Sequence, residues 1–349
     1  MNKFYKKIAE NVIERISLEK LKKKSVLITG ANGLLGSHMA SVLYLNNLKN
    51  NFQTQVTCTS LNAPPFWLKD IYSTPGFKFI QADLVKNRSE ILRGEFDYII
   101  HGATYGQPKK FLESPFETMT LNSTVTEDLL KLGAKKKVKF LFMSSSEIYG
   151  SPPKEVTPTR EDYPGNVSPL DQRSPYTSSK RFGETLCKIY SDGGFVDAKI
   201  ARVSSIYGPG ANLRDDRVIN AFIRRALQTG ELRLMDRGDQ MRRWLYITDG
   251  LCMLFHILLH GSKLVYNVCG SDLKSIKELA EFVSEQTSAK LVFPQENISD
   301  THTSGAPNQI DIDNTLIVHE AALNNLVPLR EGLTQSIAWT KDLFQENVL

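Results

Sequence analysis

The segment VLITGANGLLGSH, residues 26–38, constrains the possible fold of this 349-residue chain more than any other stretch. A short apolar strand runs into three glycines, Gly30, Gly33 and Gly36, and a helix-forming segment follows them. Glycines let the backbone turn tightly and approach a phosphate group, and a helix N-terminus presents free N–H donors with a positive dipole. The spacing therefore predicts a strand–turn–helix unit that binds a dinucleotide, with a tight turn that holds no ligand as the alternative.

Short, nearly continuous apolar segments alternate with helix-like segments along residues 24–205, the latter near 87–93 and 117–134. Such strands are typical of a parallel sheet whose two faces are both covered by helices. Beyond this region the pattern becomes irregular and mixes strands with helices. We therefore expect an α/β fold: a doubly wound parallel sheet over 24–205, and a smaller mixed α/β lobe over 206–349 that interleaves with it.

The composition is that of an ordinary globular protein, with 41% hydrophobic and 23% charged residues. The chain contains no apolar run of about 18 residues, so we expect no integral membrane contact. Its N-terminus lacks the apolar core of a signal peptide. The four cysteines are scattered without a CxxC pair and the six histidines do not cluster, which predicts no metal site and reduced thiols in a cytoplasmic protein.

The net charge of +5 arises from the N-terminus, because residues 1–24 hold eight Lys or Arg and three Asp or Glu, and 8 − 3 = 5. The rest of the chain is near neutral, so a basic surface that binds nucleic acid is not expected. Phe4, Ile8 and Val12 recur at helical spacing, which predicts an amphipathic helical extension over residues 1–23. Packing on its own protein or on a partner subunit is favoured over binding to an anionic surface.

A polar cluster directly follows the apolar strand VKFLF, where the sequence MSSSEIYG places Ser144, Ser145, Ser146 and Glu147. Ligands of open parallel sheets bind beyond the carboxyl ends of the strands, so these side chains are candidates for an active site. The plainer interpretation is a polar loop. For Ser144 a structural role is favoured, in which its buried hydroxyl hydrogen-bonds backbone groups.

Tyr176 and Lys180 are four residues apart in SPYTSSKRFGETLCKIY, so they share one face of the predicted helix. A nearby ammonium group lowers the pKa of a phenol and lets it act as a base near neutral pH. The pattern Y-x-x-x-K occurs often by chance. Its combination with a glycine turn and strand-end serines, in this order, occurs far less often.

With these motifs in this order, the sequence resembles the extended short-chain dehydrogenase/reductase family, the NAD-dependent nucleotide-sugar epimerases, dehydratases and decarboxylases. The resemblance covers residues 24–343 and includes the segments HGAT, RVSSIYGPG and RRWLYITD. It implies a Rossmann-like sheet, NAD as cofactor and a nucleotide-diphosphate sugar as substrate. It further implies that Tyr176 takes the proton of a sugar hydroxyl that loses hydride to NAD, that Lys180 lowers the pKa of Tyr176 and holds the ribose, and that Ser145 hydrogen-bonds the same oxygen.

The family motifs also assign the dinucleotide site, in the glycine turn, at several strand ends and in the Y-x-x-x-K helix. An acid that binds the adenosine ribose belongs at the end of the second strand, but Ser60 stands there and no arginine follows for a 2′-phosphate. The motif itself therefore leaves NAD and NADP open. The cofactor-binding candidates are Gly30, Asn32, Gly33, Leu34, Leu35, Gly36, Asp83, Leu84, Ala103, Thr104, Asn122, Tyr176, Lys180 and Val203.

Within the family, the likeness is strongest to UDP-glucuronate decarboxylases, on the segments GQPKKFLESPFETMTLN, SPLDQRSPYTSSKRFGETLC, DDRVINAFIRRAL and DQMRRW. Arginines at such positions can clamp a diphosphate through paired hydrogen bonds, although Arg217 and Arg242 also have an ordinary reading as surface charges. The likeness implies that the substrate is bound by Ser146, Arg173, Ser205, Arg217 and Arg242.

Four departures from the decarboxylase pattern leave the identity of the sugar open. Ser60 replaces the expected acid, Ser205 replaces an asparagine near the substrate phosphates, and Gly210 replaces an arginine. The sequence TSS at 177–179 replaces D-E-G between the tyrosine and the lysine.

Glu147 is the residue that separates the candidate reactions. In a decarboxylase, carbon dioxide leaves the 4-keto intermediate without a base at C5, and the glutamate seats the sugar. In a 4,6-dehydratase the glutamate removes the C5 proton, whereas a simple 4-epimerase needs no glutamate. We predict NAD-dependent modification of a nucleotide sugar through a 4-keto intermediate, with decarboxylation first, dehydration or epimerisation as alternatives, and a non-catalytic NAD-binding sensor as a distant one.

Two further expectations concern assembly and the fourth strand. The resemblance implies a homodimer formed through the helices at 117–134 and 176–192. His101 ends the fourth strand beside the segment GAT, and a core histidine with satisfied ring nitrogens is favoured there over a catalytic one.

Overall fold

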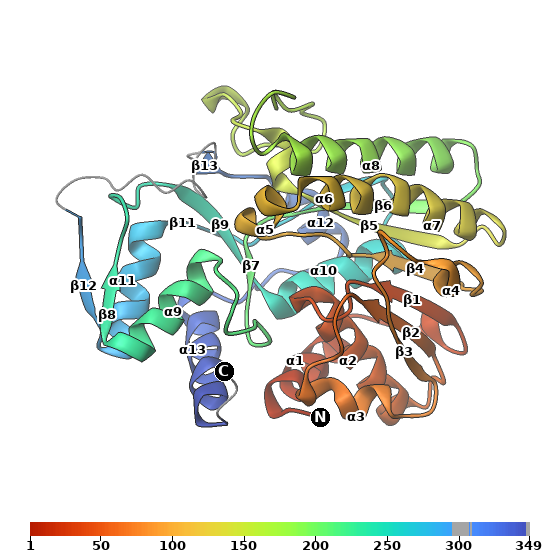
Figure 1. The fold of residues 1–349 in the computed structure, drawn as a ribbon, viewed down its shortest axis with the longest axis horizontal. Helices are drawn as coiled ribbons and strands as arrows, with labels where there is room; N and C mark the ends of the chain where they lie inside the picture. The colour runs from red at the N-terminus through yellow and green to blue at the C-terminus, as the bar shows by residue number, and fades with distance from the viewer. Residues whose placement is uncertain (295–306, 308, 347–349) are drawn as a thin grey trace.

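The computed structural model describes residues 1–294, 307 and 309–346. A seven-stranded sheet lies at its centre in the order β10-β6-β5-β4-β1-β2-β3, and every neighbouring pair is parallel (Figure 1). The chain winds outward from β1 first in one direction and then in the other, which confirms the predicted doubly wound sheet. The strands are β1 (Ser25–Thr29), β2 (Gln55–Ser60), β3 (Phe77–Gln81), β4 (Tyr98–His101), β5 (Lys139–Ser145), β6 (Asp197–Val203) and β10 (Val265–Val268).

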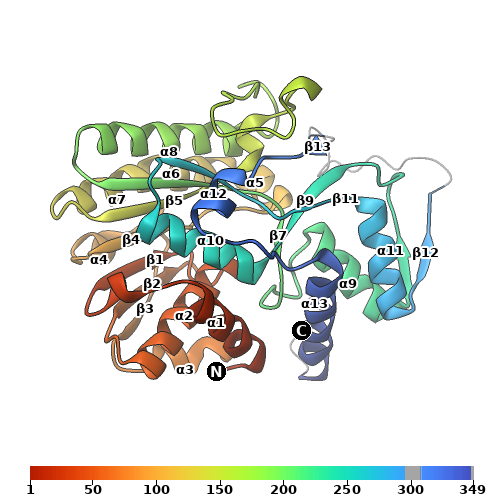
Figure 2. The same cartoon turned by 180° about the vertical axis from the view of Figure 1, so that it is seen from behind.

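Alternate residues of the central strands face opposite layers of helices, as expected for parallel strands buried on both sides. In β1, Val26 and Leu27 belong to two different hydrophobic cores, and in β5 Leu141 and Phe142 divide in the same way. One face is covered by α6 (Pro115–Asn122), α7 (Thr124–Ala134) and α8 (Ser174–Asp192), and the other by α1 (Lys3–Arg15), α2 (Leu34–Asn50) and α10 (Ile247–His260) (Figures 1 and 2).

The C-terminal part of the chain contributes to the central sheet and also forms a smaller lobe. β10 adds the edge strand beside β6, and α10 packs beneath β5 and β6. In the lobe, β7, β9, β11 and β13 form a four-stranded sheet, and β8 pairs with β12. The strands of the lobe are β7 (Ile206–Tyr207), β8 (Glu231–Arg233), β9 (Met241–Tyr246), β11 (Asp272–Ser275), β12 (Lys290–Val292) and β13 (Gln309–Ile310). The remaining helices are α3 (Lys69–Tyr72), α4 (Ser89–Leu92), α5 (Pro108–Glu113), α9 (Val218–Thr229), α11 (Ile276–Thr287), α12 (Thr315–Glu320) and α13 (Leu329–Gln345).

The helix predicted over 117–134 is in fact two helices, which corrects the sequence analysis. Ser123 has φ −115° and ψ −82°, outside the helical region, and it separates α6 from α7. Its hydroxyl donates a 2.6 Å hydrogen bond to the Met119 carbonyl, which also accepts the Ser123 N–H at 2.9 Å. Beside the break, Asn122 Nδ2 donates to Ser179 Oγ of α8 at 3.0 Å.

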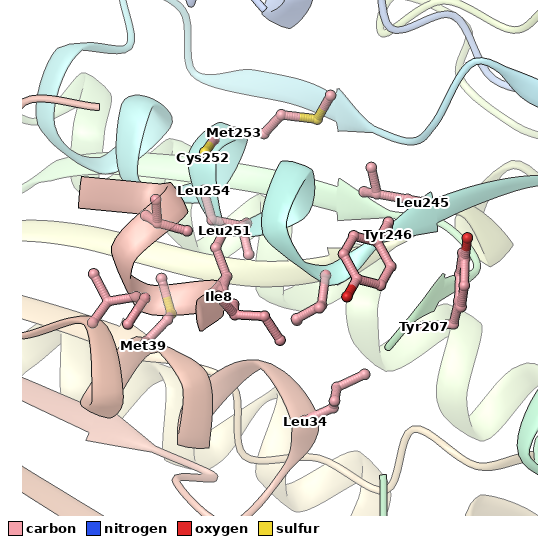
Figure 3. Packing of buried hydrophobic residues seen from close by; sticks show 14 of the residues in the cluster. Ile8, Leu34, Met39, Tyr207, Leu245, Tyr246, Leu251, Cys252, Met253 and Leu254 are labelled. Carbon is pink, nitrogen blue, oxygen red and sulfur yellow. The ribbon is translucent and has the colours of Figure 1, made fainter. Parts of the chain in front are cut away.

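The N-terminal helix α1 packs its apolar face on its own chain. Tyr5, Ile8 and Val12 are buried against α2 and α10, and Figure 3 shows Ile8 in one cluster with Leu251 of α10. Lys3, Lys6 and Lys7 of α1 are exposed on its outer side, whereas Arg15 at its end lies against α10. Within the described residues, no helix is long and apolar enough to cross a membrane.

Candidate active site

The end of β5 and the start of α8 bring Ser145 and Tyr176 together. Ser145 is the last residue of β5 and pairs in register with Val203, the last residue of β6. Pro175 occupies the first turn of α8, where its missing N–H is not needed, and Tyr176 follows it. The Ser145 hydroxyl accepts the Glu147 N–H at 3.2 Å and lies close enough to the Tyr176 phenol to lower its pKa.

Burial and nearby charges together set the acidity of Tyr176. Removal from water and the Glu147 carboxylate raise the pKa of its phenol to about 12, while the Ser145 hydroxyl and the guanidinium groups of Arg173 and Arg217 lower it. The serine and the two arginines therefore stabilise the phenolate, which is the form that can accept a proton.

Lys180 lies one helical turn beyond Tyr176 and is fully buried. Its Nζ donates a 2.6 Å hydrogen bond to the Met143 carbonyl and lies 5.9 Å from the centre of the Tyr176 ring. Burial lowers the pKa of Lys180 to about 7, although Glu184 opposes the shift. That Lys180 lowers the pKa of Tyr176 stays a prediction, and the serine and the two arginines named above act in the same direction.

Glu147 is held through both carboxylate oxygens by Arg173. Arg173 Nη2 lies 2.8 Å from Oε1 and 2.7 Å from Oε2, and Nε lies 3.1 Å from Oε2. The same guanidinium stacks 4.9 Å from the centre of the Phe111 ring, and Phe111 stacks on Tyr176 with ring centres 4.7 Å apart. The paired hydrogen bonds and the stacking fix the carboxylate and the phenol in one packed unit.

Arg217 immediately precedes α9 and pairs with Asp215, whose side chain is buried. Arg217 Nε lies 3.1 and 3.0 Å from the two Asp215 oxygens. Burial disfavours the guanidinium charge, but Asp215 and Tyr176 together raise the pKa of Arg217. Asp215 thereby holds a permanent positive charge close to the Tyr176 phenol.

Arg242, in β9, completes the charged group. It donates hydrogen bonds to main-chain carbonyls, that of Pro307 at 2.7 Å. Burial lowers the pKa of Arg242 to about 10, with Glu147 raising it and Arg173 lowering it further. The three guanidinium groups and the carboxylates of Glu147 and Asp215 sum to one net positive charge, 3 − 2 = 1, which suits an anionic ligand.

The glycine turn after β1 has the geometry that phosphate binding requires. Gly30 has φ +72°, and a Cβ there would lie 2.7 Å from a carbonyl oxygen of the neighbouring loop. A Cβ on Gly36 would lie 2.5 Å from the Gly30 carbonyl oxygen, so only glycine lets α2 come this close. Gly33 caps α2 and accepts the Ser37 N–H at 3.0 Å. The N–H groups of residues 34–36 thus have no acceptor within the helix and can bind phosphate.

Buried polar atoms around this turn fit a dinucleotide. Asn32 Oδ1, Thr104 Oγ1 and Asn122 Oδ1 are hidden from water and have no hydrogen-bond partner among the described residues. Buried polar atoms are nearly always hydrogen-bonded, so these three are suited to bind a ligand. All three belong to residues that the sequence analysis assigned to the cofactor. The N–H of Ala103, another residue predicted to bind the cofactor, already has a partner, because it donates to Thr29 Oγ1 at 3.2 Å.

The cofactor-binding candidates Asp83 and Leu84 directly follow β3, and Ser60 is the last residue of β2. Asp83 Oδ1 accepts the Val85 N–H at 3.0 Å and so caps the turn after β3. Leu84 buries its side chain in the core, which leaves its main chain to reach a ligand. Ser60 ends β2 half-buried, and Asn32 Nδ2 holds the loop after it by bonds of 2.6 and 3.0 Å to the carbonyls of residues 62 and 63.

The other predicted serines lie at the same edge of the sheet. Ser146 is buried in the short 3₁₀ turn that follows β5. Ser205 lies between β6 and β7, where its carbonyl accepts the Leu245 N–H at 3.1 Å. Ser144 donates to Glu184 at 2.6 Å and is a satisfied buried hydroxyl, although its partner is a side chain.

His101 is a core residue, as predicted. Its Nδ1 bonds Thr29 Oγ1 at 2.7 Å and its Nε2 bonds the Leu121 carbonyl at 3.1 Å. Burial lowers the pKa of His101 to about 3, so the ring is neutral.

Three residues of this site were not predicted from the sequence. Phe111 lies in a segment that carried the resemblance, but no role was assigned to it. Asp215 stands two residues before Arg217, a spacing that gives no strong signal. Glu184 lies one turn beyond Lys180 and pairs with Arg202 at 2.7 Å, a contact that only the fold creates.

Comparison with known proteins identifies the chain. Residues 26–269 match the model of the NAD dependent epimerase/dehydratase family. UDP-glucuronic acid decarboxylase 6 of Arabidopsis thaliana is 31% identical over 309 residues, which is 88% of this chain and 86% of that protein. UDP-glucuronic acid decarboxylase 1 of Xenopus tropicalis is 27% identical over 317 residues, 90% of this chain and 72% of that protein.

Two solved structures share the fold. The UDP-glucuronic acid 4-epimerase from Bacillus cereus, in complex with UDP-glucuronic acid and NAD, has a TM-score of 0.75 at 24% identity and covers 91% of this chain and 99% of that one. The dTDP-glucose 4,6-dehydratase from Streptomyces venezuelae, with NAD bound, has a TM-score of 0.77 at 21% identity and covers 91% of this chain and 97% of that one. The family match over most of the chain, together with a glycine turn and buried polar atoms that fit the cofactor, shows that this protein belongs to the NAD dependent epimerase/dehydratase family and is an enzyme that uses NAD.

Proposed function

We propose that this enzyme decarboxylates a nucleotide-diphosphate uronic acid, with UDP-glucuronate as the first substrate to test. The observation that carries the proposal is the clamp of Arg173 on both oxygens of Glu147, beside Ser145 and Tyr176. The named activity of relatives that are about 30% identical over most of this chain supports the same reaction.

The chemistry follows from the positions of the side chains. Tyr176, as phenolate, takes the proton of the C4 hydroxyl, and Ser145 hydrogen-bonds the oxygen that becomes the carbonyl. The hydride from C4 would be taken up by NAD held at the turn after β1 and would be returned to C4 at the end of the cycle. The resulting β-keto acid loses its carboxylate from C5 as carbon dioxide because the adjacent carbonyl accepts the electron pair. The enolate then takes a proton at C5 from solvent, and Tyr176 returns its proton to the C4 oxygen when C4 is reduced. The positive charges of Arg217 and Arg242 bind the anionic groups of the substrate.

The Glu147 clamp favours decarboxylation over dehydration. A glutamate that removes the C5 proton needs a free carboxylate oxygen near the sugar ring. Here each oxygen of Glu147 accepts a bond from Arg173, whose guanidinium is itself fixed against Phe111. With both oxygens held in this way, the carboxylate is placed to seat the sugar rather than to remove the C5 proton. Dehydration and epimerisation are the alternative outcomes of the same experiment.

The test is to incubate the purified protein with a panel of nucleotide sugars that includes UDP-glucuronate, and to follow product mass. We expect a product lighter by the mass of carbon dioxide. Loss of the mass of water would identify a dehydratase, and an unchanged mass with altered retention an epimerase. The variant Tyr176→Phe should bind NAD and form no product. If no sugar is converted and none perturbs bound NAD, the enzyme is not a nucleotide-sugar enzyme and a sensor role gains support.

We also propose that the protein is a homodimer formed through α6 and α8. These helices pack side by side, and their outer sides carry apolar residues that are about half exposed or more. An apolar face of this kind on a monomer is unusual unless a partner covers it. The four residues are Phe116, Met119, Phe182 and Ile189.

A cytoplasmic location agrees with the cysteines. All four are free and buried, and burial raises the thiol pKa of each. They are therefore unreactive structural residues of a kind that a reducing compartment tolerates.

A further inference from the structure

The N-terminal helix reaches the dinucleotide turn through one side chain, Tyr5. Tyr5 is 1% exposed, and its ring stacks on His38 of α2 with centres 4.0 Å apart and planes 12° apart. Its hydroxyl lies 3.1 Å from Ser37 Oγ and 3.3 Å from Trp67 Nε1. Ser37 directly follows the last glycine of the turn, and Trp67 lies in the 3₁₀ helix Phe66–Leu68 beyond β2, so Tyr5 connects two segments that are distant in sequence.

The hydrogen bonds through Tyr5 run in one direction. An indole N–H can only donate, so Trp67 donates to the Tyr5 oxygen. The Ser37 hydroxyl donates to the Leu34 carbonyl at 3.1 Å, and it therefore accepts from the Tyr5 hydroxyl. The chain ends on the peptide group between Leu34 and Leu35, whose N–H belongs to the first turn of α2. Aligned hydrogen bonds polarise one another, so this chain both orients that peptide group and strengthens its N–H as a donor.

The substrate lobe fits around the same hydroxyl. Gly210 has φ +103°, and a Cβ there would lie 2.7 Å from the Tyr5 hydroxyl and 2.8 Å from His38 Nε2. His38 Nε2 bonds the Pro209 carbonyl at 2.7 Å, and burial lowers the pKa of His38 to about 4, so the ring is neutral and donates. Gly210 is the position where the sequence departs from the arginine of the decarboxylase pattern. Tyr5 and His38 occupy the space that the Cβ of an arginine at position 210 would need.

We propose that Tyr5 is a positioning residue of the dinucleotide site, which makes the N-terminal helix part of that site. In this fold the first turn of α2 binds the pyrophosphate and the end of β2 faces the adenosine ribose. Tyr5 joins the first turn of α2 to the short 3₁₀ helix η2 (Phe66–Leu68) that follows β2, so the ligand does not bear the cost of ordering these two segments. The inference rests on NAD occupying the turn after β1.

The test compares NADH affinity with stability in the full-length protein, freed of any bound dinucleotide. Tyr5→Phe keeps the ring and removes only the hydroxyl, and Trp67→Phe removes the donor at the start of the chain. Tyr44→Phe is the matched control, because Tyr44 is also a tyrosine of this region but its ring packs edge-on against Phe77. NADH binding is followed by its fluorescence, and the unfolding temperature without ligand by circular dichroism.

We expect Tyr5→Phe to weaken NADH binding about five- to tenfold with an unfolding temperature close to that of Tyr44→Phe. The double variant of Tyr5 and Trp67 should bind NADH little worse than Tyr5→Phe, since both changes break one chain. Equal NADH affinity in Tyr5→Phe and Tyr44→Phe, or a lower unfolding temperature with unchanged affinity, would overturn the proposal. If Tyr5→Phe does not fold, unchanged affinity in Trp67→Phe overturns it. Failure of the wild-type protein to bind NADH would refute the cofactor site itself.

Discussion

Two adjacent serines at the end of β5 have different surroundings. Ser144 donates to Glu184, which also pairs with Arg202, so its hydroxyl belongs to a buried structural network. Ser145 points to the other side of the strand, where it lies within reach of the Tyr176 phenol. Successive residues of a strand alternate between its two faces, so Ser144 faces the buried network and Ser145 faces the candidate active site.

This difference predicts opposite phenotypes for two matched variants. Ser145→Ala should lower kcat by roughly 10²-fold with little change in KM, because it removes a hydrogen bond to the oxygen that changes charge. Ser144→Ala should keep kcat but lower the free energy of unfolding by about 1–3 kcal/mol, because Glu184 loses a buried partner. Steady-state kinetics and chemical denaturation measure the two effects. Equal losses of kcat in both variants would contradict the assignment of Ser145.

At the scale of elements, α6 and α8 have different environments on their inner and outer sides. The break at Ser123 places Asn122 against Ser179 of α8, and Asn122 Oδ1 remains a candidate contact for the cofactor. The outer sides of α6 and α8 carry the exposed apolar residues of the proposed dimer interface. One helix pair thus carries a candidate cofactor contact on its inner side and the surface proposed for dimerisation on its outer side.

The dimer proposal predicts the effect of a single charge on α8. Phe182→Glu should weaken dimerisation by at least about 30-fold, because a buried charge replaces a large apolar contact. Leu48→Glu on α2 is the control, since Leu48 is 61% exposed and Phe182 52% exposed, but only Phe182 lies on α8. Sedimentation velocity over a concentration series measures the change. A monomeric wild-type protein, or equal effects of the two variants, would exclude this interface.

At the scale of the whole molecule, α1 links the N-terminal part of the chain to α10 and to the C-terminal segment. Arg15, its last residue, pairs at 2.6 Å with Asp249, whose carboxylate is fully buried and also accepts the Val327 N–H at 2.6 Å. Burial raises the pKa of Asp249, while the Val327 N–H and Arg15 oppose that shift. The N-terminal helix, α10 and the C-terminal segment therefore meet on one carboxylate.

This arrangement predicts a pH-dependent loss of stability in Arg15→Ala. Near pH 7 the variant should lose roughly 2–4 kcal/mol of unfolding free energy, because ionised Asp249 keeps no counter-charge from α1. The Asp249 pKa is raised in the folded state, so its contribution to stability is greatest at low pH and is lost as pH rises through the folded value. Removing Arg15 raises that value further, so the difference between wild type and variant should shrink as pH falls. Urea denaturation between pH 4 and 8 tests this, with Arg15→Lys as control. A difference that is independent of pH would show that the ion pair is not its cause.

The sequence by itself determined the features that are encoded within short segments. The glycine turn, the alternation of strands and helices, the Y-x-x-x-K pair and the strand-end serines each lie within a few residues, so backbone geometry alone predicts their local form. Their order along the chain then indicated the family and the doubly wound sheet. The single helix expected over 117–134 was wrong, because the backbone angles of Ser123 leave the helical region and divide it into α6 and α7.

Only the tertiary structure decided which distant side chains meet. Phe111 on Tyr176, Arg173 on Glu147, and Tyr5 on the dinucleotide turn join residues from different elements, and no spacing rule relates them. The same holds for the acidity of the site, since burial raises the pKa of Tyr176 to about 12 and lowers that of Lys180 to about 7. Burial and long-range contacts are properties of the packed molecule, because they depend on every element that excludes water from the site.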